Sequence, residues 1–490
     1  MRSVPRYVAS ILVVLVAFST SDTSEASGER IGAVVGWTRI AAGGDTRCSD
    51  GSPYTFFVHS GDSLRVLLYF GGGGLCWNGV NCFEQPTHRP RVTADSTPGS
   101  DGIFDITNPE NPFSSYTIVF APYCTGDLHL GARDQQYPAT LRDGTTGAVE
   151  VHHRGLTNAL AVLDWLTAIV PNPTRIGVMG ESAGGFAVPF YGSLLAQRYP
   201  RSRVWAVIDG IGMWDLMSTP SASANWGLPE TLRHYEGWQT FPGDWSIPDL
   251  FATASHSAPR LQLFLINQAW DQGQGTWVVR LGGSAANLPS LLRLNREQIA
   301  STVPSFRVFT LGGMFHTILS EPYFYSHGAD GVRLRDWVAE IEAEDPVASV
   351  ECSKCWRPDI QFQEEHLRVV DSAIAILSAS SRWNSADVGS CPSQPSTWSL
   401  RCAFFQAGGD SPTATAAYHE LFYTALERLG GSIPPTDPAR PFNPIRLIND
   451  RQDTKAADML ELLREVRHRI VLGLSIRSPG IAPSPESGPP

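Results

Sequence analysis

The sequence predicts an α/β protein in which a mostly parallel sheet with flanking helices is followed by a smaller helical domain. Between Ile31 and about Asp345, short apolar or β-branched runs alternate with longer helical patterns. This alternation is typical of a parallel sheet covered on both faces. Beyond residue 360 helical patterns continue without a convincing strand. No repeat with a period of 20 to 50 residues is present, which argues against solenoids and propellers.

Six runs are expected as buried strands of this sheet: Leu64–Phe70, Thr117–Ala121, Arg175–Val178, Val204–Ile208, Leu261–Asn267 and Arg307–Leu311. Amphipathic or apolar helices are expected at residues 155–170, 183–197, 361–380, 413–429 and 456–472. The resulting organisation is a signal peptide over 1–26, a catalytic domain over 31–345, a linker over 346–360, a helical domain over 361–474 and a disordered tail over 475–490. The tail is rich in Pro, Ser and Gly, a composition that does not form a core.

The composition excludes several function classes. The chain has 490 residues, of which 42% are hydrophobic and 17% charged, so it holds enough apolar residues for two or three folded domains. The net charge of −11 and the absence of a basic run argue against a nucleic-acid surface. Lys354 is the first lysine, so the preceding residues offer none for Schiff-base or P-loop chemistry.

The N-terminus resembles an export signal. Arg2 and Arg6 precede the apolar run Val8–Phe18, and small residues follow at Ser24–Ala26. This arrangement predicts a secretory signal peptide and a secreted or periplasmic protein, with an N-terminal anchor or buried helix as the alternative. No later segment is apolar over the roughly 18 residues that a membrane span needs.

A candidate nucleophile follows the strand that begins at Arg175. Gly180-Glu181-Ser182-Ala183-Gly184 has the G-x-S-x-G pattern between a strand and a helix, where a sharp turn exposes the serine hydroxyl. A serine hydroxyl is a poor nucleophile at its ordinary pKa and needs a base to take its proton. We therefore predict Ser182 as the nucleophile of an α/β-hydrolase-like domain, against the alternative of a chance match in a glycine-rich chain.

Four glycines, Gly71 to Gly74, follow the strand that ends at Phe70. A hydrolase of this architecture holds a glycine-rich loop there, and its N–H groups stabilise the developing oxyanion. We call this segment the oxyanion loop and expect Ala183, the residue after the nucleophile, to supply a further donor. A phosphate cradle is the competing interpretation, but the G-x-x-x-x-G-K-[ST] pattern is missing. A flexible turn is the third interpretation.

The other catalytic residues are expected in the order serine, acid, histidine. His316 lies just beyond the strand Arg307–Leu311, and Asp271 follows the preceding strand. Asp209, at the end of another strand, is the alternative acid. The acid orients the imidazole and stabilises its cation. Among the other histidines, His234, His256 and His327 are expected to be surface or packing residues, and His366 and His419-Glu420 to be surface residues on helices.

Several motifs together resemble the pectin acetylesterases and their animal relative Notum. The motifs are Cys48–Tyr54, Gly72–Asn78 with Cys82, Pro122–Gly131, His153–Gly155 and Gly180–Gly185. The resemblance spans about residues 32–340. It implies a triad of Ser182, Asp271 and His316, with Gly73, Gly74 and Ala183 as oxyanion donors. It also implies disulfides between Cys48 and Cys124 and between Cys76 and Cys82. Plant members and Notum carry a tryptophan around the position of Gly74 or Leu75. This chain has no tryptophan at either of these two positions.

The C-terminal part, from about Gln361 to Leu472, resembles a small bacterial helical domain of unknown function. The match is carried by Trp383, Cys391, Cys402–Phe404, Asn449-Asp450 with Thr454, and the last helix. Two disulfides among Cys352, Cys355, Cys391 and Cys402 are expected in an exported chain, and a four-thiolate zinc site is the alternative.

These features predict a secreted serine carboxylester hydrolase without a metal or organic cofactor. The leading substrate is an O-acetyl group on an extracellular, pectin-like polysaccharide. The alternatives are deacylation of longer chains on lipids or lipidated proteins, and a binding protein on a hydrolase scaffold. De-esterified pectin is anionic, so an acidic enzyme acting on it needs local positive charge, for which Arg133 and Arg154 are candidates.

Overall fold

A ten-stranded sheet forms the centre of the protein, in the order β1-β2-β3-β5-β4-β8-β9-β10-β11-β14. The computed structural model describes residues 29–34, 36–213, 220–379, 382–385, 391, 396–408, 412–430 and 443–475. The strands of this sheet are β1 (Glu29–Val34), β2 (Trp37–Ala41), β3 (Thr55–His59), β4 (Asp62–Phe70), β5 (Tyr116–Ala121), β8 (Arg175–Glu181), β9 (Arg203–Asp209), β10 (Gln262–Gln268), β11 (Arg307–Leu311) and β14 (Val350–Glu351). Every pairing from β5 to β14 is parallel. The predicted α/β class is therefore confirmed.

The six expected strands all form, with ends shifted by at most three residues. Strands β1, β2 and β3 were not predicted from the sequence, and they extend the sheet with antiparallel pairings. Strands β2 and β3 have five residues each, too few for a clear periodic pattern. Their place in the sheet depends on the pairing of β3 with β5, which lies more than fifty residues further along the chain, and β2 joins the sheet through β3.

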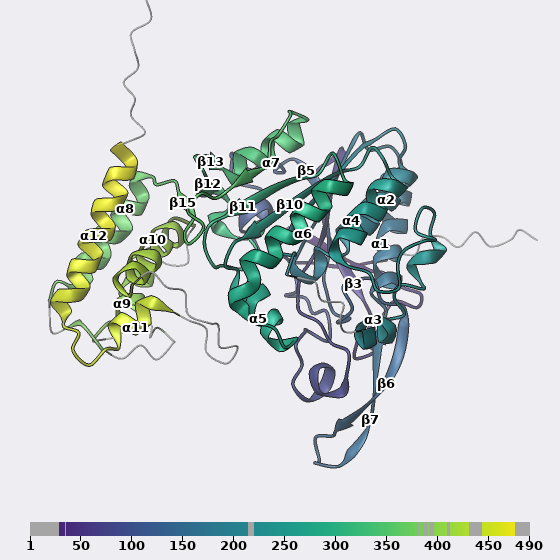
Figure 1. Cartoon of the computed structure of the whole chain (residues 1–490), viewed down its shortest axis with the longest axis horizontal. Coiled ribbons are helices and arrows are strands. Elements are labelled where there is room, and N and C mark those ends of the chain that lie inside the picture. Colours follow the sequence, from purple (N-terminus) through teal and green to yellow (C-terminus); the bar gives the residue numbers. More distant parts are fainter. Residues whose placement is uncertain are drawn as a thin grey trace, which may run out of the picture.

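Helices alternate with the parallel strands and cover the sheet. They are α1 (Gly155–Ile169), α2 (Val188–Arg198), α4 (Ile247–Ser257), α6 (Leu288–Thr302) and α7 (Leu334–Ala343). Helix α2 packs on β8 and β9 and against α4, which in turn contacts α6 (Figure 1). Trp337 of α7 packs edge-on against Phe264 and Phe309.

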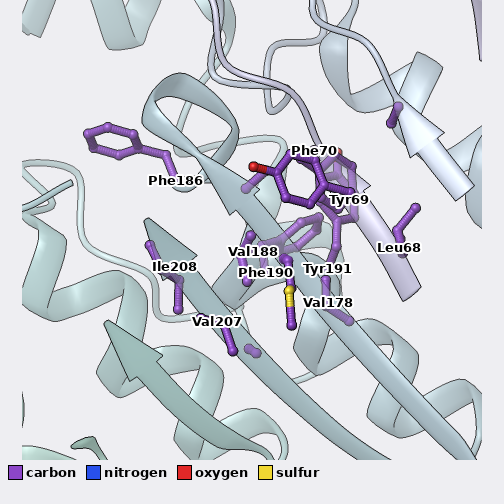
Figure 2. Packing of buried hydrophobic residues seen from close by; sticks show 14 of the residues in the cluster. Leu68, Tyr69, Phe70, Val178, Phe186, Val188, Phe190, Tyr191, Val207 and Ile208 are labelled. Carbon is purple, nitrogen blue, oxygen red and sulfur yellow. The ribbon is translucent and has the colours of Figure 1, made fainter. Parts of the chain in front are cut away.

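The core around the end of β8 is dense and aromatic. Figure 2 shows side chains of β4, β8, β9 and α2 packed together, and Phe70 stacks on Tyr191 at 4.8 Å between ring centroids. Both residues are fully buried. Burial of each such side chain contributes about 1.5–3 kcal/mol. The turn between β8 and α2, which carries Ser182, is therefore built on a rigid base.

Smaller elements surround the sheet. The hairpin β6 (Arg133–Thr140) and β7 (Thr146–His153) extends away from it, and α3 (Pro220–Trp226) lies against β6 (Figure 1). A three-stranded sheet is formed by β12 (His327–Ala329), β13 (Val332–Arg333) and β15 (Asp359–Ile360).

The segment expected as a linker, 346–360, differs from that expectation. Its strand β14 is the edge strand of the central sheet, and β15 pairs with β12. A disulfide joins Cys352 and Cys355 between them. Two-residue strands have no periodicity to detect, so the sequence showed the prolines and cysteines of this segment but not its pairing.

The C-terminal helices form a body with its own hydrophobic cluster, beside β11 of the central sheet and β15 of the three-stranded sheet (Figure 1). They are α8 (Glu364–Leu377), α9 (Leu400–Gly408), α10 (Pro412–Arg428), α11 (Pro444–Asn449) and α12 (Ala456–Ser475). Three of the five match predicted helices; α9 and α11 are short and were not anticipated. The helical region itself is confirmed.

Two predictions concern parts of the chain that are not described. The expected signal peptide, 1–26, and the expected tail beyond Ser475 lie outside the described residues. Within the described ranges, no helix combines the length and the hydropathy that crossing a bilayer requires.

Candidate active site

The candidate nucleophile occupies a sharp turn at the carboxyl end of β8. Ser182 has φ +50°, in the left-handed region that a non-glycine residue rarely adopts. A Cβ on Gly180 would lie 2.7 Å from the Gly184 carbonyl oxygen, and one on Gly184 would lie 2.1 Å from the Phe70 carbonyl oxygen. The flanking glycines are therefore required by close backbone approach, as the G-x-S-x-G pattern predicts.

The oxyanion loop passes directly over this turn. The parallel register sets Phe70 opposite Gly180, so the oxyanion loop and the turn at Ser182 begin at the same level of the sheet. A Cβ on Gly72 would lie 3.0 Å from the Ser182 Cβ. Gly73 and Gly74 have φ values of +157° and +83° and donate no backbone hydrogen bond within the described residues. Their N–H groups are thus available to an oxyanion.

Ala183 lies in a short 3-10 helix, Ser182–Gly184, that begins the turn into α2. The N–H groups in the first turn of a helix have no partner within the helix. The N–H of Ala183 can therefore contribute a donor, as expected for the residue after a nucleophile.

His316 and Asp271 contact each other through a close carboxylate–imidazole pair. The His316 Nδ1 lies 2.9 Å from Asp271 Oδ1 and 2.8 Å from Oδ2. Burial lowers the pKa of His316, but the charge and hydrogen bond of Asp271 outweigh it and raise this pKa above its ordinary value. The contact through Nδ1 leaves Nε2 free of the carboxylate, which is the arrangement in which an imidazole can accept a serine proton.

Asp271 is itself held rigidly. It is the N-cap of α5 (Gln272–Arg280), where Oδ1 accepts the Gln274 N–H at 2.9 Å. The Gln274 side-chain amide donates to Oδ2 at 3.0 Å. A short N-cap turn after β10 therefore fixes the carboxylate toward His316. Gln274 was not among the site residues predicted from the sequence, although the N-cap pattern Asp-x-x-Gln is a signal that indicates it.

The alternative acid, Asp209, contacts the backbone beyond His316 instead of the imidazole. Its Oδ2 accepts the N–H groups of Ile318 at 2.6 Å and Leu319 at 2.9 Å. Burial raises its pKa to about 7, against the lowering effect of these two donors. Asp209 therefore supports the segment after the histidine, and the orientation of the imidazole comes from Asp271.

Ser182 and His316 lie at the same edge of the sheet but make no hydrogen bond in this structure. Glu181 accepts a hydrogen bond from Ser320, so the segment after His316 is tied to the residue before Ser182. Triad contacts are often long without substrate and tighten when it binds. The geometry thus brings all three predicted residues to the carboxyl ends of β8, β10 and β11, and the contact between Ser182 and His316 is the one that is not formed.

A cavity of about 430 Å³ opens beside the oxyanion loop and is lined by Gly71, Gly72 and Gly73. Its charged lining residues are Asp101, Glu181, Glu321 and Arg89. Burial, followed by repulsion from Glu181 and Asp101, raises the pKa of Glu321 to about 7. The cavity is therefore acidic.

The two arginines proposed as positive charge for the cleft do not line this cavity. Arg133 forms an ion pair with Glu230, and Arg154 with Asp134. Each is already paired with a carboxylate, so neither gives the cavity a net positive charge.

The other histidines with a sequence-based expectation differ in burial. His234 and His256 are exposed, and His327 is buried in the core. These positions agree with the expectation of surface or packing residues. The expectation of surface positions for His366 and for His419-Glu420 is wrong, because all three are buried. His419 and Glu420 are covered by contacts with His327 and Arg357, which a helical pattern alone does not reveal.

All eight cysteines are paired in disulfides. Cys48–Cys124 and Cys76–Cys82 are the pairs that the resemblance implied. The other four pair as Cys352–Cys355 and Cys391–Cys402, so the alternative of a four-thiolate zinc site is wrong. Disulfides of this number are typical of an oxidising compartment.

The motif Pro122–Gly131 supports the oxyanion loop, a role that the sequence analysis missed. His129 contacts the Gly71 carbonyl oxygen through Nε2 at 3.0 Å. Tyr123 fills the space beside Gly73, where a Cβ would lie 2.9 Å from its ring. The sequence signal was present as a family motif, but its contact with the loop is visible only in three dimensions.

Comparison with known proteins gives one family. Residues 34–224 match the model of the pectinacetylesterase family. The matched segment contains the oxyanion loop and Ser182 and ends before Asp271 and His316. No curated protein matches this chain.

Proposed function

Because residues 34–224 match the pectinacetylesterase family model, we propose that this chain is a carboxylester hydrolase of that family whose nucleophile is Ser182. The family implies an ester substrate. The observation that carries the assignment of residues is the arrangement at the strand ends. A strained serine follows β8, and a carboxylate–imidazole pair lies on the loops after β10 and β11.

The mechanism proceeds through an acyl-enzyme. His316 Nε2 takes the proton of the Ser182 hydroxyl as the oxygen attacks the ester carbonyl, and Asp271 stabilises the imidazolium. The N–H groups of Gly73, Gly74 and Ala183 stabilise the oxyanion. The imidazolium then protonates the leaving alcohol. Water, activated by the same imidazole, cleaves the acyl–serine bond and releases the acid.

The leading substrate is an O-acetyl group on an extracellular polysaccharide. The acidic lining of the cavity, with Asp101, Glu181 and Glu321 against Arg89, repels a polyanion. It therefore favours a neutral acetylated polysaccharide, or pectin whose carboxyl groups are methyl-esterified, over de-esterified pectin. Export through the N-terminal segment would bring the enzyme to such a polymer.

One observation favours the alternative of a longer acyl chain. Trp277 lies beside the oxyanion loop, 3.6 Å from where a Cβ on Gly74 would be, and its ring centroid is 6.4 Å from that of Trp77. The indole rings of Trp77 and Trp277 therefore give the oxyanion loop an apolar border. Such a border also suits an apolar acyl group.

The decisive experiment is a panel of p-nitrophenyl esters from acetate to palmitate, run beside acetate release from acetylated xylan and from acetylated pectin of high and low methyl esterification. A steep preference for acetate, with xylan and methyl-esterified pectin ahead of de-esterified pectin, is expected. An optimum at about eight carbons or more would favour deacylation of lipids.

Ser182→Ala is the control for the mechanism. This variant should stay folded and lose roughly 10⁶-fold in kcat. Turnover like that of the wild type in Ser182→Ala would refute the assignment of the nucleophile. A wild-type protein that hydrolyses no ester of the panel would instead support the binding-protein alternative.

A further inference from the structure

His316 lies at the seam between two hydrophobic cores. Met314, two residues before it, is 1% exposed and belongs to the hydrophobic cluster of the C-terminal helices. Ile318 and Leu319, just after it, belong to the cluster of the central sheet. The segment Gly312–Thr317, which we call the histidine loop, is therefore built partly into each core.

Helix α10 supplies the contacts from the helical side. The Tyr423 hydroxyl accepts the Met314 N–H at 3.3 Å. The Phe315 ring stacks on the His419 ring with 3.8 Å between centroids and 10° between planes. Gly313 has φ +108°, and a Cβ there would lie 2.3 Å from the Tyr423 hydroxyl oxygen. The loop and the helix thus fit closely, residue by residue.

The opposite side of the histidine loop is held by the catalytic domain. The Gln272 N–H donates to the Met314 carbonyl at 2.9 Å, and the Phe315 N–H donates to Gln268 Oε1 at 3.1 Å. The Gly313 N–H donates to the Cys355 carbonyl at 3.0 Å. The backbone before His316 is therefore fixed between β10, the Cys352–Cys355 loop and α10.

Helix α10 is in turn anchored to the catalytic side by buried polar contacts. Glu420, 1% exposed, forms an ion pair with Arg357, which lies between β14 and β15. The His419 Nδ1 lies 2.8 Å from the His327 Nε2 on β12. Both rings are buried, so this contact is shielded from water. The helix cannot shift without breaking these contacts, and it therefore presents Tyr423 and His419 to the loop in a fixed position.

We propose that the C-terminal helical domain positions the general base of the enzyme, with Tyr423 and His419 of α10 as positioning residues for His316. The proposal rests on the proposed function of His316. A displacement of about 1 Å in a catalytic group can cost roughly 100-fold in rate. A loop that is held from one side only would allow such displacements, and the helical domain supplies the second side.

The test uses point variants of the full chain, because removal of residues from 346 onward would also remove β14 from the sheet and expose Met314. Tyr423→Phe removes the acceptor for the Met314 N–H and keeps the ring. Tyr418→Phe is the matched control. It removes a hydroxyl from the same helix, and that hydroxyl accepts a hydrogen bond from Asn443 within the helical domain. The readouts are kcat, KM and the pH profile with p-nitrophenyl acetate, and hydrogen exchange of the histidine-loop amides.

Tyr423→Phe should lower kcat about tenfold and leave KM within about twofold, with the acidic limb of the pH profile displaced. Amide exchange in residues 312–317 should rise in this variant and stay at the wild-type level in Tyr418→Phe. Phe315→Leu, which removes the stack on His419, should lower kcat about 10- to 100-fold. If circular dichroism shows that Tyr423→Phe does not fold, the result for Phe315→Leu tests the proposal instead.

Wild-type kcat and exchange in both Tyr423→Phe and Phe315→Leu would overturn the proposal. Equal losses in Tyr423→Phe and Tyr418→Phe would also overturn it, because the effect would then come from the stability of the domain. Failure of the proposed function has a different signature: the wild type lacks esterase activity, while the exchange experiment still reports whether α10 holds the histidine loop.

Discussion

Replacement of Asp271 by asparagine separates the two candidate acids. In the folded protein the carboxylate of Asp271 receives hydrogen bonds from the Gln274 N–H and side-chain amide, and both oxygens face His316 Nδ1. An asparagine keeps one oxygen for the Gln274 N–H and places its NH₂ group toward the imidazole. Gln274 Oε1 has no partner among the described residues, so a rotated Gln274 side chain can accept from the new NH₂ group in exchange for its present hydrogen bond to Asn267 Oδ1. The variant should therefore fold.

The expected loss follows from the tautomer of His316. An NH₂ group donating to Nδ1 forces the proton onto Nε2, and the imidazole can then no longer take the proton of Ser182. The same replacement in the triad of serine proteases costs about 10⁴ in kcat. We expect a loss of roughly 10³- to 10⁴-fold in Asp271→Asn, which corresponds to about 4–5.5 kcal/mol of transition-state stabilisation.

Asp209→Asn is the matched control. An asparagine oxygen can still accept the N–H groups of Ile318 and Leu319. Burial already raises the pKa of Asp209 to about 7, so its neutral form is close in energy to the charged one and resembles asparagine. The loss should stay within about tenfold. The assay is kcat/KM for p-nitrophenyl acetate with folding checked by circular dichroism. Equal losses in the two variants, or a larger loss in Asp209→Asn, would refute this reasoning.

Three further predictions concern pH and the backbone. Because Asp271 raises the pKa of His316, the acidic limb of kcat/KM should lie above pH 6.5, and Asp271→Asn should move it lower; a wild-type limb near pH 5 would contradict this. Gly74→Ala places a Cβ 1.9 Å from the Thr87 carbonyl oxygen at φ +83°, so the loop must move and kcat should fall about 100-fold, measured beside the melting temperature. Burial lowers the pKa of His419 to about 3, so the unfolded chain binds the proton first as pH falls from 6.5 toward 3, and folding stability is lost across that window. By pH 5 the decrease in the free energy of unfolding amounts to about 2 kcal/mol. Urea unfolding at pH 7 and pH 5 should show a smaller decrease in His419→Gln than in the wild type.

The parallel centre of the fold could be predicted because its strands are long apolar runs. β4, β8, β9 and β10 each have seven or more residues and are buried over most of their length. The two-residue strands β14 and β15 offer no such pattern. Their pairing depends on neighbours that are distant in sequence, and local periodicity carries no information about those neighbours.

The candidate site shows the same division. Ser182 and the oxyanion loop lie in compact glycine patterns whose steric requirement is local, so the sequence indicates them directly. Asp271 and Asp209 both follow strands, and the sequence left both open. The choice between them depends on the direction of each carboxylate, which the N-cap turn at Gln274 and the backbone of Ile318 set.

The sequence by itself determined the residue types, their order and the sharp turns, because glycine spacing and apolar runs act over a few residues. The tertiary structure alone decided which carboxylate meets the imidazole, the acidity of the cavity beside the oxyanion loop and the contact of α10 with the histidine loop. The physical reason is that hydrogen bonds, burial and charge act between groups close in space. Met314 and Tyr423 lie 109 residues apart in the chain and become neighbours only when the two cores pack together.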